Sequence, residues 1–168
     1  RTDLDDVIAA AAPEMVAIVF TTGHGLDRAR AESLARAGTA CVTIGIEAAD
    51  ARRHDAVRSS IGSFTEAESA ARACCEAGLY LAISTIGTRE RIASGELEAM
   101  YDLGAAWGAG EFRILAPVAT GAWRGCGAVM LTPDERQQLI DFHIEHNRRR
   151  SGPIVASFAY LESDALFG

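Results

Sequence analysis

The 168-residue sequence has no excess of positive charge, no long apolar run and no leader-like start. Its formal net charge of −7 argues against a general affinity for phosphate backbones, so we expect no nucleic-acid partner. No apolar stretch reaches the roughly 20 residues that a bilayer-spanning helix needs, so we expect no membrane association. Residues 1–6 are strongly polar, which is not the pattern of a signal peptide.

The four cysteines show no Cys-x-x-Cys spacing. They are Cys41, Cys74, Cys75 and Cys126, and the adjacent pair falls on one predicted helix, where neighbouring side chains point in different directions. This pattern does not indicate a disulfide framework, so we expect a protein of the reducing cytoplasm.

The composition is that of a folded domain, with 49% apolar and 23% charged residues. We expect residues 1–168 to form a single domain. The sequence begins at Arg1 rather than at Met and stops at Gly168 directly after an apolar segment. We therefore expect it to be an excerpt of a longer protein.

Short apolar runs alternate with helical stretches along the whole sequence. The predicted strands are 15–22, 40–47, 80–85, 112–118 and 153–160, and the predicted helices are 3–12, 27–37, 64–77, 96–107 and 133–149. The first strand is apolar without alternation, which is typical of a strand covered on both faces. This order predicts an α/β fold with parallel strands, either a doubly wound sheet or a (β/α) barrel.

In both architectures, chemistry lies at the carboxyl ends of the strands. The first strand ends at Thr21 and Thr22, whose hydroxyls suit a polar ligand but are also ordinary at strand exits. The second strand ends at Glu47, an acceptor for ribose hydroxyls or a base, and Gly45 leaves space beside it.

The third and fourth strands end in further candidates. Arg89 follows the third strand and is suited either to bidentate binding of a carboxylate or to a surface position. Leu115 and Ala116 end the fourth strand and offer backbone or apolar contacts. His143 and His146, spaced i, i+3 on the last helix, have no evident third ligand, and we expect them to be solvated.

Several short motifs occur in a familiar order. They are TTGHGL at 21–26, LARAG at 34–38, GIE at 45–47, HDAVR at 54–58, GSF at 62–64 and STIGTR at 84–89. In this order and spacing, the segments resemble the central portion of a radical S-adenosylmethionine (radical SAM) barrel. They are most similar to the branch with the peptide-modifying (SPASM-like) enzymes and the molybdenum-cofactor cyclase.

The resemblance implies a TIM-like partial (β/α)6 barrel with a [4Fe-4S] cluster. The cluster would pass an electron to S-adenosylmethionine, and the resulting 5′-deoxyadenosyl radical would abstract hydrogen from a substrate, such as a peptide. By resemblance, the cofactor-binding residues are Thr21, Thr22, Gly45, Glu47, Arg89, Leu115 and Ala116. Arg89 would hold the methionyl carboxylate. The resemblance assigns no catalytic residue and no metal ligand in this chain.

Three departures from the family pattern stand out. The C-x-x-x-C-x-x-C triad is absent, so we expect this portion, truncated at both ends of the barrel, to be inactive alone. Gly23 replaces the usual Asn, and Gly45 replaces the usual Ser and supplies no hydroxyl. Glu47 replaces the usual Asp.

Two alternatives remain open. One is a divalent-metal TIM-barrel isomerase or aldolase that uses His24, Glu47 and Glu90. The other is a non-catalytic nucleotide-binding barrel relative, for which the glycines at 23 and 45 argue. In any truncated barrel the terminal strands have unpaired edges, so we expect self-association.

Overall fold

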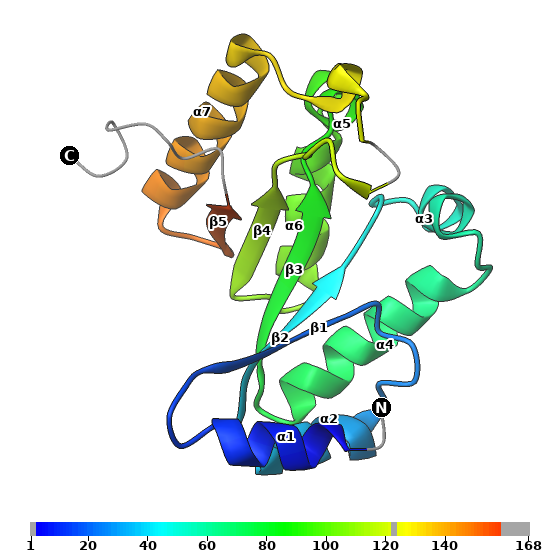
Figure 1. Ribbon diagram of the computed structural model, residues 1–168, viewed down its shortest axis with the longest axis vertical. Helices are drawn as coiled ribbons and strands as arrows, with labels where there is room; N and C mark the ends of the chain where they lie inside the picture. The colour runs from blue at the N-terminus through cyan, green and yellow to red at the C-terminus, as the bar shows by residue number, and fades with distance from the viewer. Residues whose placement is uncertain (1–2, 122–123, 159–168) are drawn as a thin grey trace.

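The computed structural model describes residues 3–121 and 124–158. Five parallel strands form one sheet in the order β1-β2-β3-β4-β5. Their bounds are β1 Ala17–Thr21, β2 Thr39–Gly45, β3 Tyr80–Ile86, β4 Glu111–Leu115 and β5 Ile154–Phe158. Because each strand lies beside its successor in the sequence and helices fill every connection, the chain is a run of consecutive β/α units (Figure 1).

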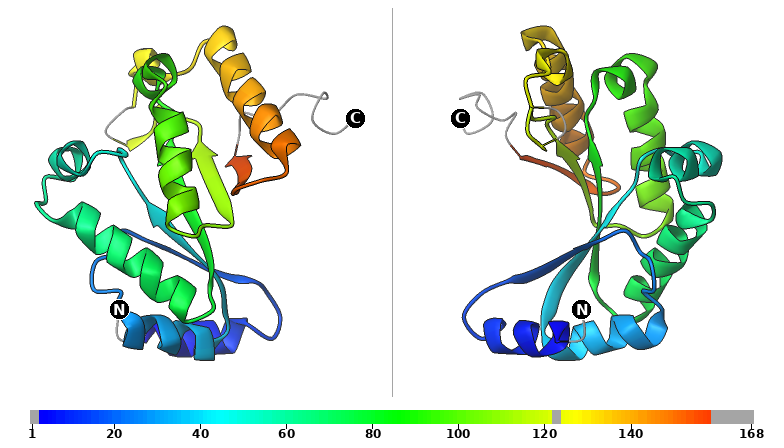
Figure 2. Two further views of the ribbon diagram at one scale, coloured as in Figure 1. Left: turned by 180° about the vertical axis from the view of Figure 1, so that it is seen from behind. Right: turned by 45° about the vertical axis from the view of Figure 1, so that its right-hand side comes forward.

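Seven α-helices and a short 3-10 turn are described. They are α1 Leu4–Ala11, α2 Arg28–Ala37, α3 Ala51–Arg58, α4 Ser63–Glu76, α5 Arg89–Ser94, α6 Glu96–Ala106, η2 Gly127–Val129 and α7 Pro133–Arg149. Helices α1 and α2 lie side by side below the sheet in Figure 1, and Figure 2 shows the strongly twisted sheet from two further sides. The alternation predicted from the sequence is confirmed, with strands and helices close to their expected bounds.

The core lies between the sheet and the helices. Alternate strand residues face the helices and are almost completely buried: Val42, Ile44, Leu81, Ile83, Phe112 and Ile114. The residues between them point to the opposite side, which in a closed barrel would be the interior. We call this side the open face.

The open face explains one wrong prediction. The first strand was expected to be covered on both sides, yet Ile18 is 42% exposed and Phe20 57% exposed. Both belong to β1, the outer strand of the sheet, where the described residues supply no neighbour on one edge. The apolar run therefore reflects a surface that residues 3–121 and 124–158 leave uncovered.

Two helices were missed and one histidine was misplaced. Helices α3 and α5 are short and polar. Each begins at a capping side chain: Asp50 accepts a hydrogen bond from the Arg53 N–H, and Thr88 accepts one from the Arg91 N–H. His146, expected to be solvated, is 2% exposed and stacks on Phe142 with ring centroids 3.9 Å apart.

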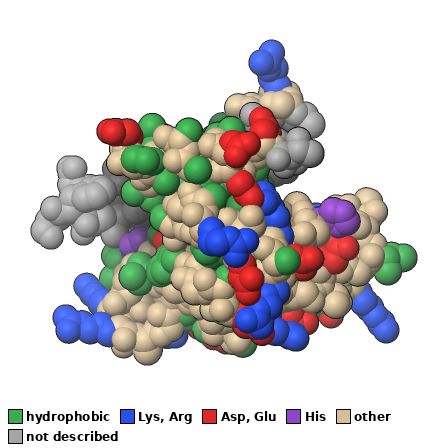
Figure 3. Space-filling model, turned by 90° about the horizontal axis from the view of Figure 1, so that it is seen from below, with side chains coloured by type: hydrophobic (Ala, Val, Ile, Leu, Met, Phe, Trp, Pro, Cys, Tyr) green, Lys and Arg blue, Asp and Glu red, His purple; other side chains and the backbone are tan. Residues whose placement is uncertain are grey.

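Charge is distributed without a dominant sign at the end of the molecule formed by α1 and α2. Figure 3 shows acidic and basic side chains interspersed there. Several form ion pairs, such as Arg30 with Asp5 at 2.7 Å and Arg28 with Glu32 at 2.9 Å.

Candidate functional site

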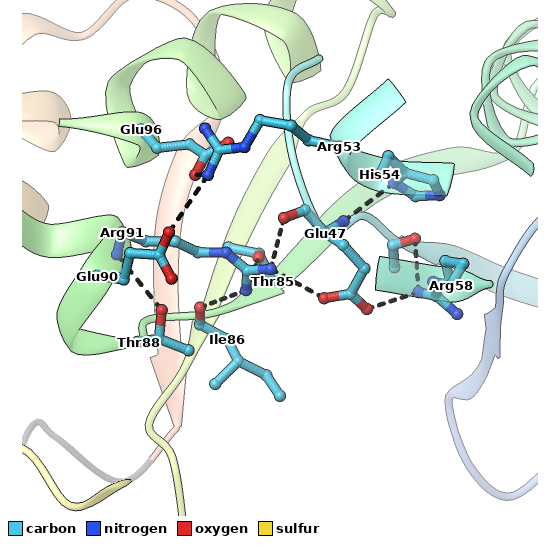
Figure 4. Close-up of polar contacts among 11 residues, drawn as sticks. Glu47, Arg53, His54, Arg58, Thr85, Ile86, Thr88, Glu90, Arg91 and Glu96 are labelled. Atoms are coloured by element: carbon cyan, nitrogen blue, oxygen red, sulfur yellow. Dashed lines mark hydrogen bonds and ion pairs between the residues drawn. The ribbon is translucent and has the colours of Figure 1, made fainter. Parts of the chain in front are cut away.

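The candidate site lies where β2 and β3 end, around the carboxylate of Glu47. Arg58 Nη2 lies 3.0 Å from Glu47 Oε1, and Arg91 Nη2 lies 3.0 Å from Glu47 Oε2 (Figure 4). The Glu47 side chain is 24% exposed, so the ion pairs are partly shielded from water while one side of the carboxylate stays reachable. One acid is thus fixed by two cations from different helices, α3 and α5.

The segment 54–64 builds this arrangement. His54 is 1% exposed, and its Nδ1 accepts a hydrogen bond from the main-chain N–H of Glu47 at 3.1 Å. Burial, followed by the charge of Arg58, lowers the pKa of His54, which keeps the ring neutral and able to accept. Arg58 also donates to the carbonyl of Gly45 at 3.1 Å. The motif therefore holds both the backbone and the carboxylate at the end of β2.

Asp55 ties the same segment to α4. Its carboxylate accepts from the N–H groups of Gly62 at 2.6 Å and Phe64 at 2.9 Å, and from the Ser63 hydroxyl at 2.9 Å. The backbone hydrogen bonds from Gly62 and Phe64 hold the pKa of Asp55 below its usual value. Gly62 is the N-cap of α4 and makes no side-chain capping hydrogen bond, so Asp55 supplies the acceptor at this helix start.

Arg91 was not among the residues predicted for the site. It is 8% exposed, and its Nη1 donates to Thr85 Oγ1 at 3.0 Å and to the Ile86 carbonyl at 2.8 Å. The only sequence signal was a second arginine two positions after Arg89. Because α5 was not predicted, nothing indicated which arginine would point back to the sheet.

Arg89 points away from Glu47. Its Nε lies 2.6 Å from Glu135 Oε1, and its Nη2 donates to the Met130 carbonyl at 2.9 Å. Its side chain is 50% exposed and joins α5 to the start of α7. The predicted contact with a methionyl carboxylate is not tested by this geometry.

The threonines after β1 shape the turn that follows. Thr21 Oγ1 accepts from the Gly23 N–H at 3.1 Å, and Thr22 Oγ1 accepts from the His24 N–H at 3.5 Å. Gly23 has φ of +92°, and a Cβ there would lie 2.8 Å from Ala67 Cα. The backbone and α4 together explain why this position holds glycine rather than the Asn of the family pattern.

Gly45 and the end of β4 complete the predicted set. A Cβ on Gly45 would lie 3.1 Å from Arg58 Nη2 and 3.9 Å from Ser84 Oγ, so the glycine lets the Arg58 guanidinium approach the backbone at the end of β2. Leu115 and Ala116 are partly buried, and the Leu115 carbonyl accepts from the Gly87 N–H at 2.9 Å. The structure thus gathers Gly45 and Glu47 at one place and puts Arg89 elsewhere.

The residues proposed for a divalent metal do not converge. His24 lies 3.0 Å from Glu66, Glu47 is paired with arginines, and Glu90 is 81% exposed with Arg53 at 3.6 Å. No group of three potential metal ligands occurs within residues 3–121 and 124–158. The finding covers cysteines as well, so the described residues offer no set of ligands for a [4Fe-4S] cluster; Cys41 and Cys74 are buried, and Cys75 and Cys126 are exposed.

Comparisons with known proteins identify the fold. No family model matches the sequence, and no curated protein matches it significantly. Streptococcus suis SuiB bound to its precursor peptide SuiA superposes with a TM-score of 0.73 and 11% identity, over 94% of this chain and 35% of SuiB. SuiB bound to S-adenosylmethionine gives 0.69 and 13%, over 94% and 36%.

A second solved protein agrees. The protein anSMEcpe with bound AdoMet and the Cp18Cys peptide gives a TM-score of 0.61 and 15% identity, over 83% of this chain and 40% of that one. At these identities the likeness concerns the fold alone: the parallel strands alternating with helices match part of the TIM-like barrel of these two solved proteins, as the sequence predicted. The chain spans about a third of SuiB's length. Within the described residues, no helix has the length and apolar content to cross a membrane.

Proposed function

We propose that this chain is the S-adenosylmethionine-binding portion of a radical SAM oxidoreductase, in a barrel longer than the chain. The observation that carries the proposal is the Glu47 carboxylate, fixed between Arg58 and Arg91 at the carboxyl end of the sheet with its side chain 24% exposed. A preoriented carboxylate at this edge is suited to accept hydrogen bonds from the ribose hydroxyls of the cofactor.

The other predicted residues have supporting roles in this proposal. Leu115 and Ala116 offer backbone and apolar contacts to the cofactor, and Thr21 and Thr22 stabilise the loop beside the site. Arg89 binds the methionyl carboxylate in this proposal, a contact that either adds to or replaces its ion pair with Glu135. The alternative is that the Glu47 site binds the cofactor without any contact from Arg89.

The reaction implied by the resemblance is reductive cleavage of S-adenosylmethionine to a 5′-deoxyadenosyl radical. The described residues do not fit a [4Fe-4S] cluster, so we assign it no ligand in this chain. SuiB and anSMEcpe were each crystallised with a peptide, which supports a peptide as the substrate class. The alternative is a non-catalytic nucleotide-binding barrel, which the glycine at position 45 favours.

The test uses the full-length protein, reconstituted anaerobically with iron and sulfide and reduced with dithionite. We expect 5′-deoxyadenosine to form from S-adenosylmethionine, and formation to fall sharply in Arg91→Ala, because this variant removes one of the two ion pairs that orient Glu47. Arg89→Ala separates the two versions of the proposal: loss of product supports its carboxylate-binding role, and unchanged product removes that role. If the wild type takes up no iron and forms no product, the proposal of an enzyme is contradicted and the nucleotide-binding alternative remains.

A further inference from the structure

The open face carries one hydroxyl whose surroundings the proposed function does not use. Ser84 lies on β3 directly opposite Gly45 of β2 in the parallel register. It alternates with the core residues Leu81 and Ile83, and so points to the open face. Ser84 is 6% exposed.

The Ser84 hydroxyl has no hydrogen-bond partner in the described part of the chain. Ser84 Oγ is not sealed from solvent, so a ligand can reach it from the open face. A nearly buried hydroxyl without a protein partner costs stability unless water or a ligand bonds it. This observation points to a ligand independently of Glu47.

The position of the hydroxyl relates it to the candidate site. The place of the missing Gly45 side chain has Arg58 Nη2 at 3.1 Å on one side and Ser84 Oγ at 3.9 Å on the other. The main-chain N–H of Ile46 donates to the Ser84 carbonyl at 2.9 Å, which fixes the two strands at this level. A charged donor and a hydroxyl therefore border position 45, and the Arg58 that supplies the donor also pairs with the Glu47 carboxylate; we call this place the niche.

We propose that Ser84 binds a ribose hydroxyl of S-adenosylmethionine in this niche and supplies the hydrogen bond that Gly45 cannot. A vicinal diol has two donors and two acceptors. It is matched by a carboxylate that accepts and by a serine hydroxyl that both donates and accepts. This inference rests on the proposed function and names a specificity-determining residue within the same site.

The niche also predicts that a hydroxyl on β2 can replace the Ser84 hydroxyl on β3. A serine introduced at position 45 would place its hydroxyl in the space that Ser84 borders. The added Cβ would lie 3.1 Å from Arg58 Nη2 and at ordinary contact distance from Ser84 Oγ and the Thr21 carbonyl, so a shift of a few tenths of an ångström at the end of the Arg58 side chain accommodates it without breaking the ion pair with Glu47. One hydroxyl, from either strand, is therefore sufficient.

The experiment measures the dissociation constant of S-adenosylmethionine by equilibrium dialysis against the full-length protein. We expect Ser84→Ala to weaken binding roughly 3- to 10-fold, as for one neutral hydrogen bond. Gly45→Ser in the Ser84→Ala background should restore it. Thr43→Val is the matched control, because it removes a buried open-face hydroxyl nearer the start of β2, and it should leave the constant unchanged.

A second readout is independent of the folded fraction. The preference for S-adenosylhomocysteine over its 2′,3′-dideoxyribose analogue should shrink in Ser84→Ala and not in Thr43→Val. If Ser84→Ala binds S-adenosylmethionine as tightly as the wild type and its preference is unchanged, the Ser84 assignment is overturned and the proposed function stays intact. Wild-type protein that binds no S-adenosylmethionine contradicts the proposed function itself.

Discussion

Arg58 Nη2 lies 3.0 Å from the carboxylate of Glu47 and also donates to the carbonyl of Gly45 at 3.1 Å. A single guanidinium thus fixes both the functional side chain and the backbone two residues before it. The glycine is part of this geometry, because a side chain at position 45 would meet the same guanidinium. Glu47, Arg58 and Gly45 therefore form one unit that sequence spacing alone presents as three separate positions.

Arg58→Ala should weaken binding of S-adenosylmethionine about tenfold, because the Glu47 carboxylate loses one of the two charged hydrogen bonds that orient it. Arg53→Ala is the control on the same helix, since Arg53 pairs with Glu96 at 2.9 Å rather than with Glu47. Isothermal titration calorimetry of both variants of the full-length protein provides the comparison. Equal affinities in the two variants would show that Arg58 does not support the site.

The stability of the protein should fall as the pH drops below about 6.5, the ordinary pKa of histidine. Burial lowers the pKa of His54 in the folded state, so the unfolded chain takes up a proton at a pH where the folded chain does not. The stabilising effect of the neutral His54 ring is complete above about pH 6.5 and is lost as the pH falls through the pKa of His54 in the folded state.

Urea unfolding between pH 5 and 7.5 measures this dependence. His54→Asn should flatten it, because Asn provides an acceptor for the Glu47 N–H without titrating. The pKa of His143 is also lowered by burial, so His143→Gln should remove a separate part of the slope. A His54→Asn variant with the full wild-type slope would assign the dependence to other groups.

Gly23 and Gly25 form a matched pair for backbone strain. Both have positive φ, +92° and +68°, but a Cβ at Gly23 would lie 2.8 Å from Ala67 Cα whereas nothing lies within 4 Å at Gly25. Gly25→Ala should cost about 1 kcal/mol, and Gly23→Ala should cost at least about 2 kcal/mol, because α4 must also move. Thermal unfolding of the two variants gives the comparison, and equal losses would mean that the turn relaxes without disturbing α4.

The isolated chain should self-associate through β1. Phe20 and Ile18 are 57% and 42% exposed beside an edge that no described strand covers. Light scattering across a concentration series should show oligomers that Phe20→Gln reduces. Ile61→Gln, which removes an equally apolar side chain that is fully exposed between α3 and α4, should leave them unchanged. A monomer at all concentrations would contradict this expectation.

Most of the fold could be predicted because its signals are local. Buried parallel strands are continuous apolar runs, and helix ends carry recognisable caps, as Thr132 and Glu135 do at α7. Helices α3 and α5 were missed because both are short and polar, so no apolar stripe indicates them. The open face could not be foreseen either, since an apolar strand has the same sequence whether or not a neighbour covers it.

The site was predictable only in part. Gly45 and Glu47 lie at the end of a strand that the sequence predicts, so their position could be inferred. Arg91 depends on the direction in which a short helix leaves β3, and Ser84 depends on the pairing of β2 with β3. These relationships arise between segments distant in the sequence, so a single sequence contains no periodic signal for them.

The most direct test of the account is the affinity of the full-length protein for S-adenosylmethionine, measured for the wild type, Glu47→Gln and Glu111→Gln. Glu111 pairs with Arg113 at the opposite end of the sheet and therefore controls for the loss of a paired carboxylate. We expect the wild type and Glu111→Gln to bind equally and Glu47→Gln to bind at least about tenfold more weakly. Equal binding by all three proteins would contradict the claim that the Glu47 carboxylate is the centre of the cofactor site.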